Sequence, residues 1–144
     1  MKQKQVISSP LVPETNAPFS NAVVYDGMIY ISGLPPFDAA FAKRIRDARA
    51  KGEPPPPMDD VPFEQQVRIV MDHMKALVEA AGSSMDNLLK VTVWLKDQTN
   101  SEIFDRIYRG YFSGPDKLPA RTRMQAGRTP LDCGLEVDAI GFVP

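Results

Sequence analysis

Residues 62–82 read PFEQQVRIVMDHMKALVEAAG, and residues 89–95 read LKVTVWL. In the first stretch, apolar residues recur at steps of three and four, which predicts an amphipathic helix that stops at Gly82. The second stretch is rich in β-branched residues that alternate between two faces, which predicts a strand. A second helical stripe covers residues 103–112, and the preceding residues 99–102 (TNSE) fit a capping box. These elements form the centre of the predicted fold.

Further strands are predicted on both sides of this centre. They cover residues 22–25, 28–32, 120–126 and 135–143, with one short strand in the proline-rich arm of residues 1–18. The first two flank Asp26-Gly27, which is a strong hairpin signal. The order β-β-β-α-β-α-β-β predicts an α+β fold with two helices on one face of a mostly antiparallel sheet. The open second face would favour self-association.

Residues 37–60 interrupt this pattern. Residues 39–51 are rich in Ala, Arg and Lys, which predicts a short helix with a solvated, charged face that ends at Gly52. The prolines at 54–57 exclude a helix or a central strand. We interpret the segment as a long excursion from a single domain that covers residues 1–144, and long loops in compact domains are often functional.

Composition and charge exclude several classes of protein. The chain has 144 residues, and 17 Lys and Arg against 18 Asp and Glu give a formal charge of −1, so no nucleic-acid partner is expected. No apolar run is long enough for a membrane span, and no apolar block marks a signal peptide. The single cysteine, Cys133, favours a reducing cytoplasm, and we interpret it as an unactivated thiol. The single histidine, His73, argues against a His-rich metal site and is interpreted as a partly exposed helix residue.

Two pairs of charged residues are candidates for chemistry. Alternation in the last two predicted strands puts Arg121 and Arg123 on one face of the first, and Glu136 and Asp138 on one face of the second. We expect the two strands to lie close together. Two interpretations stay open from the pattern: a surface ion-pair network, or a site in which an arginine holds a substrate carboxylate.

Several short motifs occur in a distinctive order. They are Ile31-Ser32-Gly33, Val78-Glu79-Ala80-Ala81-Gly82, Val91-Thr92-Val93-Trp94-Leu95-Lys96-Asp97, Tyr108 with Phe112, Pro119-Ala120-Arg121 and Leu135-Glu136-Val137-Asp138-Ala139-Ile140. Together they resemble the Rid family of reactive intermediate/imine deaminases, also labelled YjgF/YER057c/UK114 or L-PSP endoribonuclease, over residues 17–143 apart from the excursion. The resemblance implies a chorismate-mutase-like fold and a homotrimer with clefts between subunits. It also implies hydrolysis of enamines or imines of carboxylic acids to 2-oxo acids and ammonia, without a metal or a cofactor.

The resemblance also implies roles for individual residues. The substrate-carboxylate arginine of the family falls on Arg121 and its water-positioning glutamate falls on Glu136, so these are the predicted catalytic residues. Ser32 and Gly33 match a turn that lines the family's cleft. Tyr108 belongs to the same predicted substrate-binding set.

Four cleft positions differ from the residues usual in the family. Phe19 replaces a tyrosine, Leu34 a glutamine, Asp105 an asparagine, and Arg123 a small residue. These changes predict a cleft that is more apolar in one part and more cationic in another. The substrate would then be larger or more acidic than 2-aminoacrylate, with Arg123 binding a second carboxylate, as in an aminomuconate-type acid. The alternative is that Arg123 pairs with Asp138 or with Asp105.

Two other functions stay open from the sequence. The altered cleft is compatible with a non-catalytic trimer that binds a carboxylate or has a regulatory role. The family's older name implies RNA cleavage, which the near-neutral charge disfavours. The segment 37–60 is expected to cover the cleft or to add a wall to it.

Overall fold

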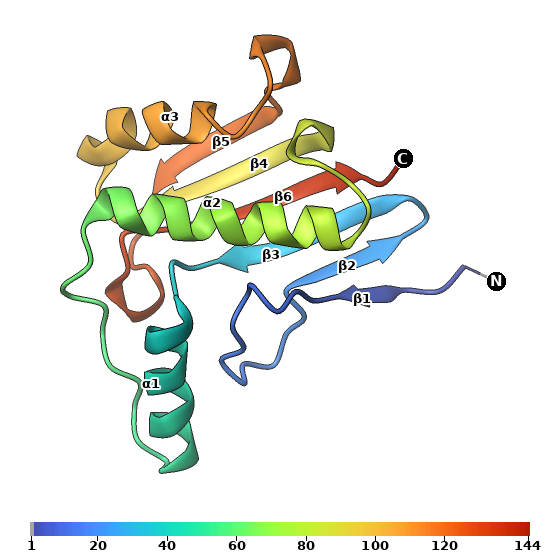
Figure 1. Cartoon of the computed structure of the whole chain (residues 1–144). Coiled ribbons are helices and arrows are strands. Elements are labelled where there is room, and N and C mark those ends of the chain that lie inside the picture. The colour runs from blue at the N-terminus through green and yellow to red at the C-terminus, as the bar shows by residue number, and fades with distance from the viewer. Residues whose placement is uncertain (1) are drawn as a thin grey trace.

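The computed structural model describes residues 2–144 and contains a six-stranded sheet with two helices across one face (Figure 1). The strands are β1 (Gln5–Ile7), β2 (Ala22–Tyr25), β3 (Met28–Leu34), β4 (Leu88–Leu95), β5 (Ala120–Gln125) and β6 (Leu135–Phe142). The helices are α1 (Ala39–Ala50), α2 (Phe63–Ala80) and α3 (Ser101–Arg109). The order across the sheet is β1-β2-β3-β6-β4-β5, and neighbouring strands are antiparallel except β4 and β5. The predicted α+β fold is confirmed, with α1 inside the excursion.

The core lies between the sheet and the helices α2 and α3. Alternate residues of β4 and β6 are fully buried, and so is the apolar stripe of α2. They are Val91, Val93, Leu95, Leu135, Val137, Val67, Val70, Met71, Met74, Leu77 and Val78. Phe104 of α3 is also fully buried, and it anchors the helix that joins the parallel strands β4 and β5. The apolar faces predicted from the helical and strand periodicities of the sequence therefore pack together in one layer.

The other face of the sheet carries large apolar side chains that remain exposed. Tyr30, Trp94, Met124 and Ile140 are between 36% and 55% exposed, and Phe142 is 37% exposed. They come from four neighbouring strands, and Thr92 and Asp138 lie between Trp94 and Ile140 on this face. We call these five residues the open-face cluster. Large apolar side chains exposed together on one face of a sheet often mark a contact with another protein.

The start of α3 differs from the predicted capping box. Asn100 is the N-cap, and its side chain makes no capping hydrogen bond. Instead, the carboxylate of Asp97 accepts hydrogen bonds from the backbone N–H and the hydroxyl of Thr99, at 2.9 and 2.7 Å. An aspartate two residues before a polar residue can form such a local turn, and here it takes the backbone N–H of Thr99, which the carboxylate of Glu102 would accept in a capping box.

The excursion is ordered and has its own small apolar cluster. We call Phe37, Phe41, Ile45, Met58 and Cys133 the α1 cluster; Leu131 packs beside it. Asp38 caps α1 by accepting from the backbone N–H of Phe41 at 2.9 Å, and Gly52, with φ of 70°, ends it as predicted. The return of the chain is fixed by a hydrogen bond from the N–H of Met58 to the carbonyl of Leu131, at 2.8 Å. As Figure 1 shows, α1 projects away from the sheet.

The sequence predicted that the charged face of α1 is solvated. In the structure, part of this face contacts the N-terminal part of the chain. Arg46 and Arg49 each donate from Nη1 to a backbone carbonyl of the N-terminal arm, those of Glu14 and Thr15. We define the N-terminal arm as residues 8–21. The excursion therefore holds the arm beside β3, and both contribute to the pocket described next.

Candidate functional site

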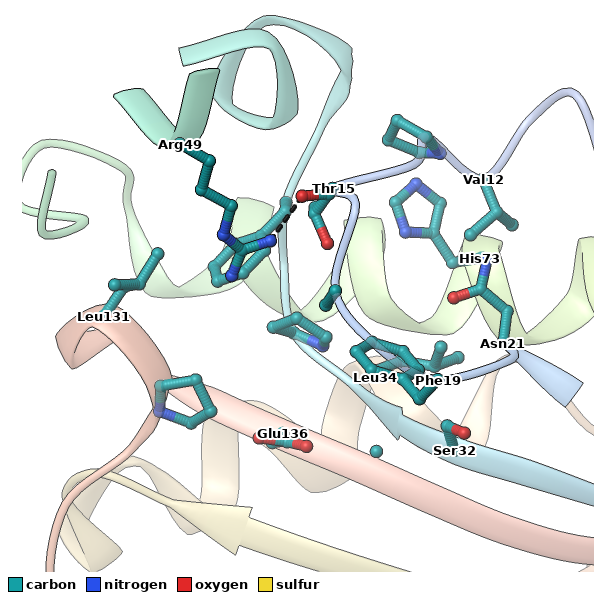
Figure 2. Close-up of a pocket in the computed structure, with 16 residues that line it drawn as sticks. Val12, Thr15, Phe19, Asn21, Ser32, Leu34, Arg49, His73, Leu131 and Glu136 are labelled. Atoms are coloured by element: carbon teal, nitrogen blue, oxygen red, sulfur yellow. Dashed lines mark hydrogen bonds between the residues drawn. The ribbon is translucent and has the colours of Figure 1, made fainter. Parts of the chain in front are cut away.

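A pocket of about 390 Å³ lies between the N-terminal arm, β3, β6 and α1 (Figure 2). Five of the predicted site residues line it, namely Phe19, Ser32, Gly33, Leu34 and Glu136. Apolar groups make up most of its wall, and Glu136 supplies a carboxylate at its base. Pockets that bind small molecules have this character, with a few polar groups placed in a mainly apolar wall. We call this the Glu136 pocket.

Ser32 and Gly33, which the sequence predicted as a turn, lie within β3 at an irregularity in its pairing, and hydrogen bonds hold Ser32 to the arm. The N–H of Ser32 donates to the carbonyl of Asn21 at 2.9 Å, and its hydroxyl donates to the carbonyl of Ser20 at 2.6 Å. The pairing of β3 with β6 shifts between Ile31 and Leu34. This irregularity brings the backbone of Gly33 against the side chain of Glu136.

Gly33 leaves the space that the Glu136 carboxylate occupies. A Cβ atom at position 33 would lie 1.9 Å from Oε1 of Glu136 and 2.8 Å from its Cδ. A side chain at position 33 would therefore have to displace the carboxylate. Position 33 needs glycine because of its packing against Glu136, and not because of its backbone conformation.

Gly33→Ala is expected to lower kcat of the activity proposed below by roughly 10- to 100-fold, because small displacements of a catalytic group are costly. The fold should tolerate it, since the end of a flexible side chain is what must move. Steady-state kinetics together with a melting curve would check this. A variant with full activity would show that the position of the Glu136 carboxylate does not matter.

Glu136 is half-buried, and burial raises the pKa of its carboxyl, with a further contribution from the charge of Asp138. Its carboxylate forms no ion pair with any group of residues 2–144. The adjacent strand β4 places Trp94 opposite Glu136. A carboxyl with a raised pKa next to a pocket has the properties of a general base or acid.

The remaining predicted residues form a second group at α3 and β5. Asp105, Tyr108 and Arg121 line a separate pocket of about 330 Å³, together with Pro119. Nη1 of Arg121 lies 2.8 Å from Oδ1 of Asp105. The guanidinium also stacks over the ring of Tyr108, 5.1 Å from its centroid. Burial raises the pKa of Tyr108 to about 12, so its hydroxyl stays protonated.

Arg123 pairs with Asp105, as the ion-pair alternative expects. Its Nη1 lies 2.5 Å from Oδ1 of Asp105, and its side chain is only 18% exposed. Burial by itself would raise the pKa of Asp105, but the hydrogen bonds from Arg123 and Arg121 outweigh it and hold that pKa below its ordinary value. Arg123 therefore neutralises Asp105, which leaves most of the donors of Arg121 available.

The two groups lie on opposite faces of the sheet. Arg121 aligns with Val91, which is fully buried on the helix-covered face, whereas Glu136 aligns with Trp94 and Met124 of the open face. The expectation that the last two strands lie close together is wrong, because β6 inserts between β3 and β4 and leaves β5 at the edge. One chain therefore does not bring Arg121 and Glu136 into the same pocket.

The structure also brings residues to the Glu136 pocket that sequence reasoning did not assign to it. Arg49 reaches the pocket from α1, and His73 reaches it from α2, where burial lowers the pKa of the imidazole although Asp72 and Asp38 oppose this. No spacing pattern marks either residue, since both depend on how the excursion and the arm fold back. Cys133 is buried, and burial raises its pKa to about 11, as expected for an unactivated thiol.

The family of this chain follows from its similarity to known proteins. The model of the family described as Endoribonuclease L-PSP matches residues 10–143. The chain belongs to the L-PSP family. The resemblance to the Rid family read from the sequence is confirmed, because a similar solved structure belongs to the Rid protein family.

Relatives in the L-PSP family align along nearly the full length of the chain. A RutC family protein from Pyrococcus horikoshii is 30% identical over 96% of this chain and 98% of its own. A solved Rid-family protein from Yersinia pestis has a TM-score of 0.79, with 26% identity over 98% of this chain and 100% of its own. A putative endoribonuclease L-PSP from Entamoeba histolytica has a TM-score of 0.78, with 31% identity over 97% and 99%.

Within residues 2–144, no helix is long and apolar enough to cross a bilayer. The same part of the chain contains no group of three or more His, Cys, Asp or Glu side chains arranged to hold a metal ion.

Proposed function

We propose that this L-PSP family member is a cofactor-independent deaminase that hydrolyses 2-enamine and 2-imine acids to 2-oxo acids and ammonia. Two relatives support the reaction class. Proteins from Mus musculus and Dermatophagoides farinae, 28% and 25% identical to this chain, are both named 2-iminobutanoate/2-iminopropanoate deaminase. The observation that carries the proposal is the Glu136 carboxylate, half-buried and free of ion pairs within residues 2–144, at the base of a mainly apolar pocket.

The complete site is proposed to form between subunits of a homotrimer. Glu136 and Arg121 face opposite sides of the sheet, so one chain cannot bring both to the same substrate. The open-face cluster provides apolar surface for association. In a cyclic assembly the same two surfaces of each subunit meet repeatedly, which would produce one Glu136–Arg121 cleft per interface.

The reaction needs one carboxylate anchor, one placed water and a route for protons. In the proposed mechanism the enamine tautomerises to an imine, and Arg121 of one subunit holds the substrate carboxylate through paired N–H donors. Glu136 of the next subunit accepts a proton from water as its oxygen attacks the imine carbon. That proton passes to the nitrogen and gives the neutral carbinolamine. The proton of its hydroxyl then moves through Glu136 to the amino nitrogen, the C–N bond breaks, and ammonia leaves as the C=O of the 2-oxo acid forms. Positioning of the reactants supplies much of the rate.

The pH dependence should report the ionisation of Glu136. Water activation needs the ionised carboxylate, so kcat should fall as pH decreases through the pKa of Glu136. The negative charge of Asp138 raises that pKa. Asp138→Asn removes this charge, and we expect the acid limb of the kcat profile to move to lower pH. A limb that stays in place, or moves to higher pH, would contradict Glu136 as the titrating base.

Ammonia release tests the proposal directly. 2-Iminobutanoate, generated in the assay from the amino acid by an amino-acid oxidase, should be consumed faster with the protein than without it. Absence of any acceleration, with 2-oxobutanoate still bound by the protein, would favour the non-catalytic carboxylate-binding alternative. Cleavage of RNA by protein that does not accelerate imine hydrolysis would favour the endoribonuclease alternative.

A further inference from the structure

We propose that Arg49 of α1 binds a second, distal carboxylate of the substrate, so that this chain prefers 2-imine and 2-enamine diacids. This inference rests on the proposed function and names a substrate class for it. From the sequence, Arg123 was expected to bind a second carboxylate of the substrate. Here this role is assigned to Arg49, which the sequence did not indicate. Arg123 does not fit this role because it pairs with Asp105 and lines neither the Glu136 pocket nor the pocket at Arg121.

The position of Arg49 is the first argument. Its side chain lines the Glu136 pocket although it comes from the excursion. Figure 2 shows its guanidinium on the wall across from Glu136, with one hydrogen bond, to the carbonyl of Thr15. A guanidinium has five N–H donors, so this contact fixes its position and leaves donors for a ligand.

The charge around Arg49 is the second argument. No carboxylate of residues 2–144 forms an ion pair with Arg49. Arg44, Arg46, Arg68 and Arg109 are likewise unpaired among these residues, but of the five only Arg49 lines the Glu136 pocket. Arg49 lies in the last turn of α1, where a cation also complements the helix dipole. The helix dipole explains why a cation lies near the end of α1, but it does not explain why the Arg49 side chain points into the pocket.

The shape and lining of the pocket are the third argument. Its volume of about 390 Å³ leaves room beyond a three-carbon acid. Apolar side chains, among them Phe19, Leu34 and Phe37, line the wall; the two charged groups are Glu136 and Arg49, and Thr15, Asn21, Ser32 and His73 are the other polar lining residues. A ligand whose reacting carbon lies at Glu136 and whose apolar chain ends in a carboxylate at Arg49 matches this distribution. The α-carboxylate would bind Arg121 of the neighbouring subunit, and the distal one would bind Arg49.

Arg46 provides a matched control. It lies one turn before Arg49 on α1, and it also donates to an arm carbonyl, that of Glu14. It is not among the residues that line the Glu136 pocket. Arg46→Gln therefore removes a similar charge and a similar arm contact without changing the pocket wall.

The experiment compares two six-carbon substrates that differ only at the far end, 2-iminoadipate and 2-iminohexanoate. Wild-type protein should have the higher kcat/KM for the diacid. Arg49→Gln should lower kcat/KM for 2-iminoadipate by at least about tenfold, as expected for a lost charged hydrogen bond. Its kcat/KM for 2-iminohexanoate, and both values of Arg46→Gln, should stay within about twofold of wild type.

The outcomes separate this inference from the proposed function. Turnover of both substrates without a diacid preference, or an equal loss for both in Arg49→Gln, would overturn the role of Arg49 and leave the deaminase in place. If neither substrate is turned over, the deaminase proposal fails. In that case, calorimetry with 2-oxoadipate and 2-oxohexanoate decides. Tighter binding of the diacid that is lost in Arg49→Gln supports the distal site, and equal binding rejects it.

Discussion

Replacement of Glu136 by Gln is expected to reduce kcat for imine hydrolysis by roughly 10²- to 10⁴-fold, the usual contribution of a general base. The amide keeps the size of the carboxyl group but cannot accept the proton of the attacking water. Because burial already disfavours the charged form of Glu136, the neutral amide should not destabilise the fold. Binding of the product 2-oxobutanoate, measured by calorimetry, should persist.

A surface glutamate gives the matched control for this substitution. Glu64 of α2 pairs with Arg106 of α3 at 2.5 Å, and both side chains are more than half exposed. Glu64→Gln removes the same charge from a residue that does not line the pocket, and it should keep wild-type kcat. Full activity in Glu136→Gln would remove the carboxylate from the mechanism, and loss of product binding together with activity would assign it a binding role instead.

Replacement of Arg121 by Gln is expected to lower kcat/KM by roughly 10²- to 10⁴-fold, because two charged hydrogen bonds to the substrate carboxylate are lost. The fold should persist, since Arg123 still neutralises Asp105 and keeps the carboxylate paired. Product binding should weaken together with turnover, which is the opposite of the pattern expected for Glu136→Gln. Kinetics and calorimetry on the same preparations would show the difference.

Arg106→Gln is the corresponding control, since it removes an exposed guanidinium from the other end of the Glu64 pair. If Arg121→Gln unfolds the protein, Arg121→Lys keeps the charge but not the two-pronged donor geometry, and an intermediate loss is then expected. Unchanged substrate affinity in a folded Arg121 variant would exclude this residue as the carboxylate anchor.

The two inactive variants also test the shared cleft. When Arg121→Gln and Glu136→Gln chains are unfolded, mixed equally and refolded, about a quarter of the clefts in random trimers should contain both intact residues. Activity should therefore return to about that fraction of wild type, although each variant alone is inactive. Mixtures that stay inactive would contradict a site built from two subunits.

Much of the fold follows from the sequence because its signals are local. The stripe of α2, the alternation of β4 and the Asp26-Gly27 turn each depend on residues that are close in the chain. The capping box was wrong because Asp97, just outside that motif, provides a competing local acceptor. The neighbours of β5 and β6 depend on the crossover through α3, which no single segment encodes.

The candidate site was less predictable because its residues are brought together by contacts between distant parts of the chain. The family resemblance indicated Glu136 and Arg121, but it could not show that one chain places them on opposite faces of its sheet. Arg49 gave no sequence signal at all. Its place in the pocket depends on the packing of the α1 cluster and on the contact of the arm with α1.

The α1 cluster has a consequence for how the protein family can diversify. Its residues are buried apart from the main core between the sheet and α2, with Leu131 packed beside them. Substitutions in α1 can therefore change the outer wall of the pocket while the stability margin of the sheet is preserved. Substitutions in α1 would then change which molecules the pocket accepts without changing the residues of the proposed reaction centre.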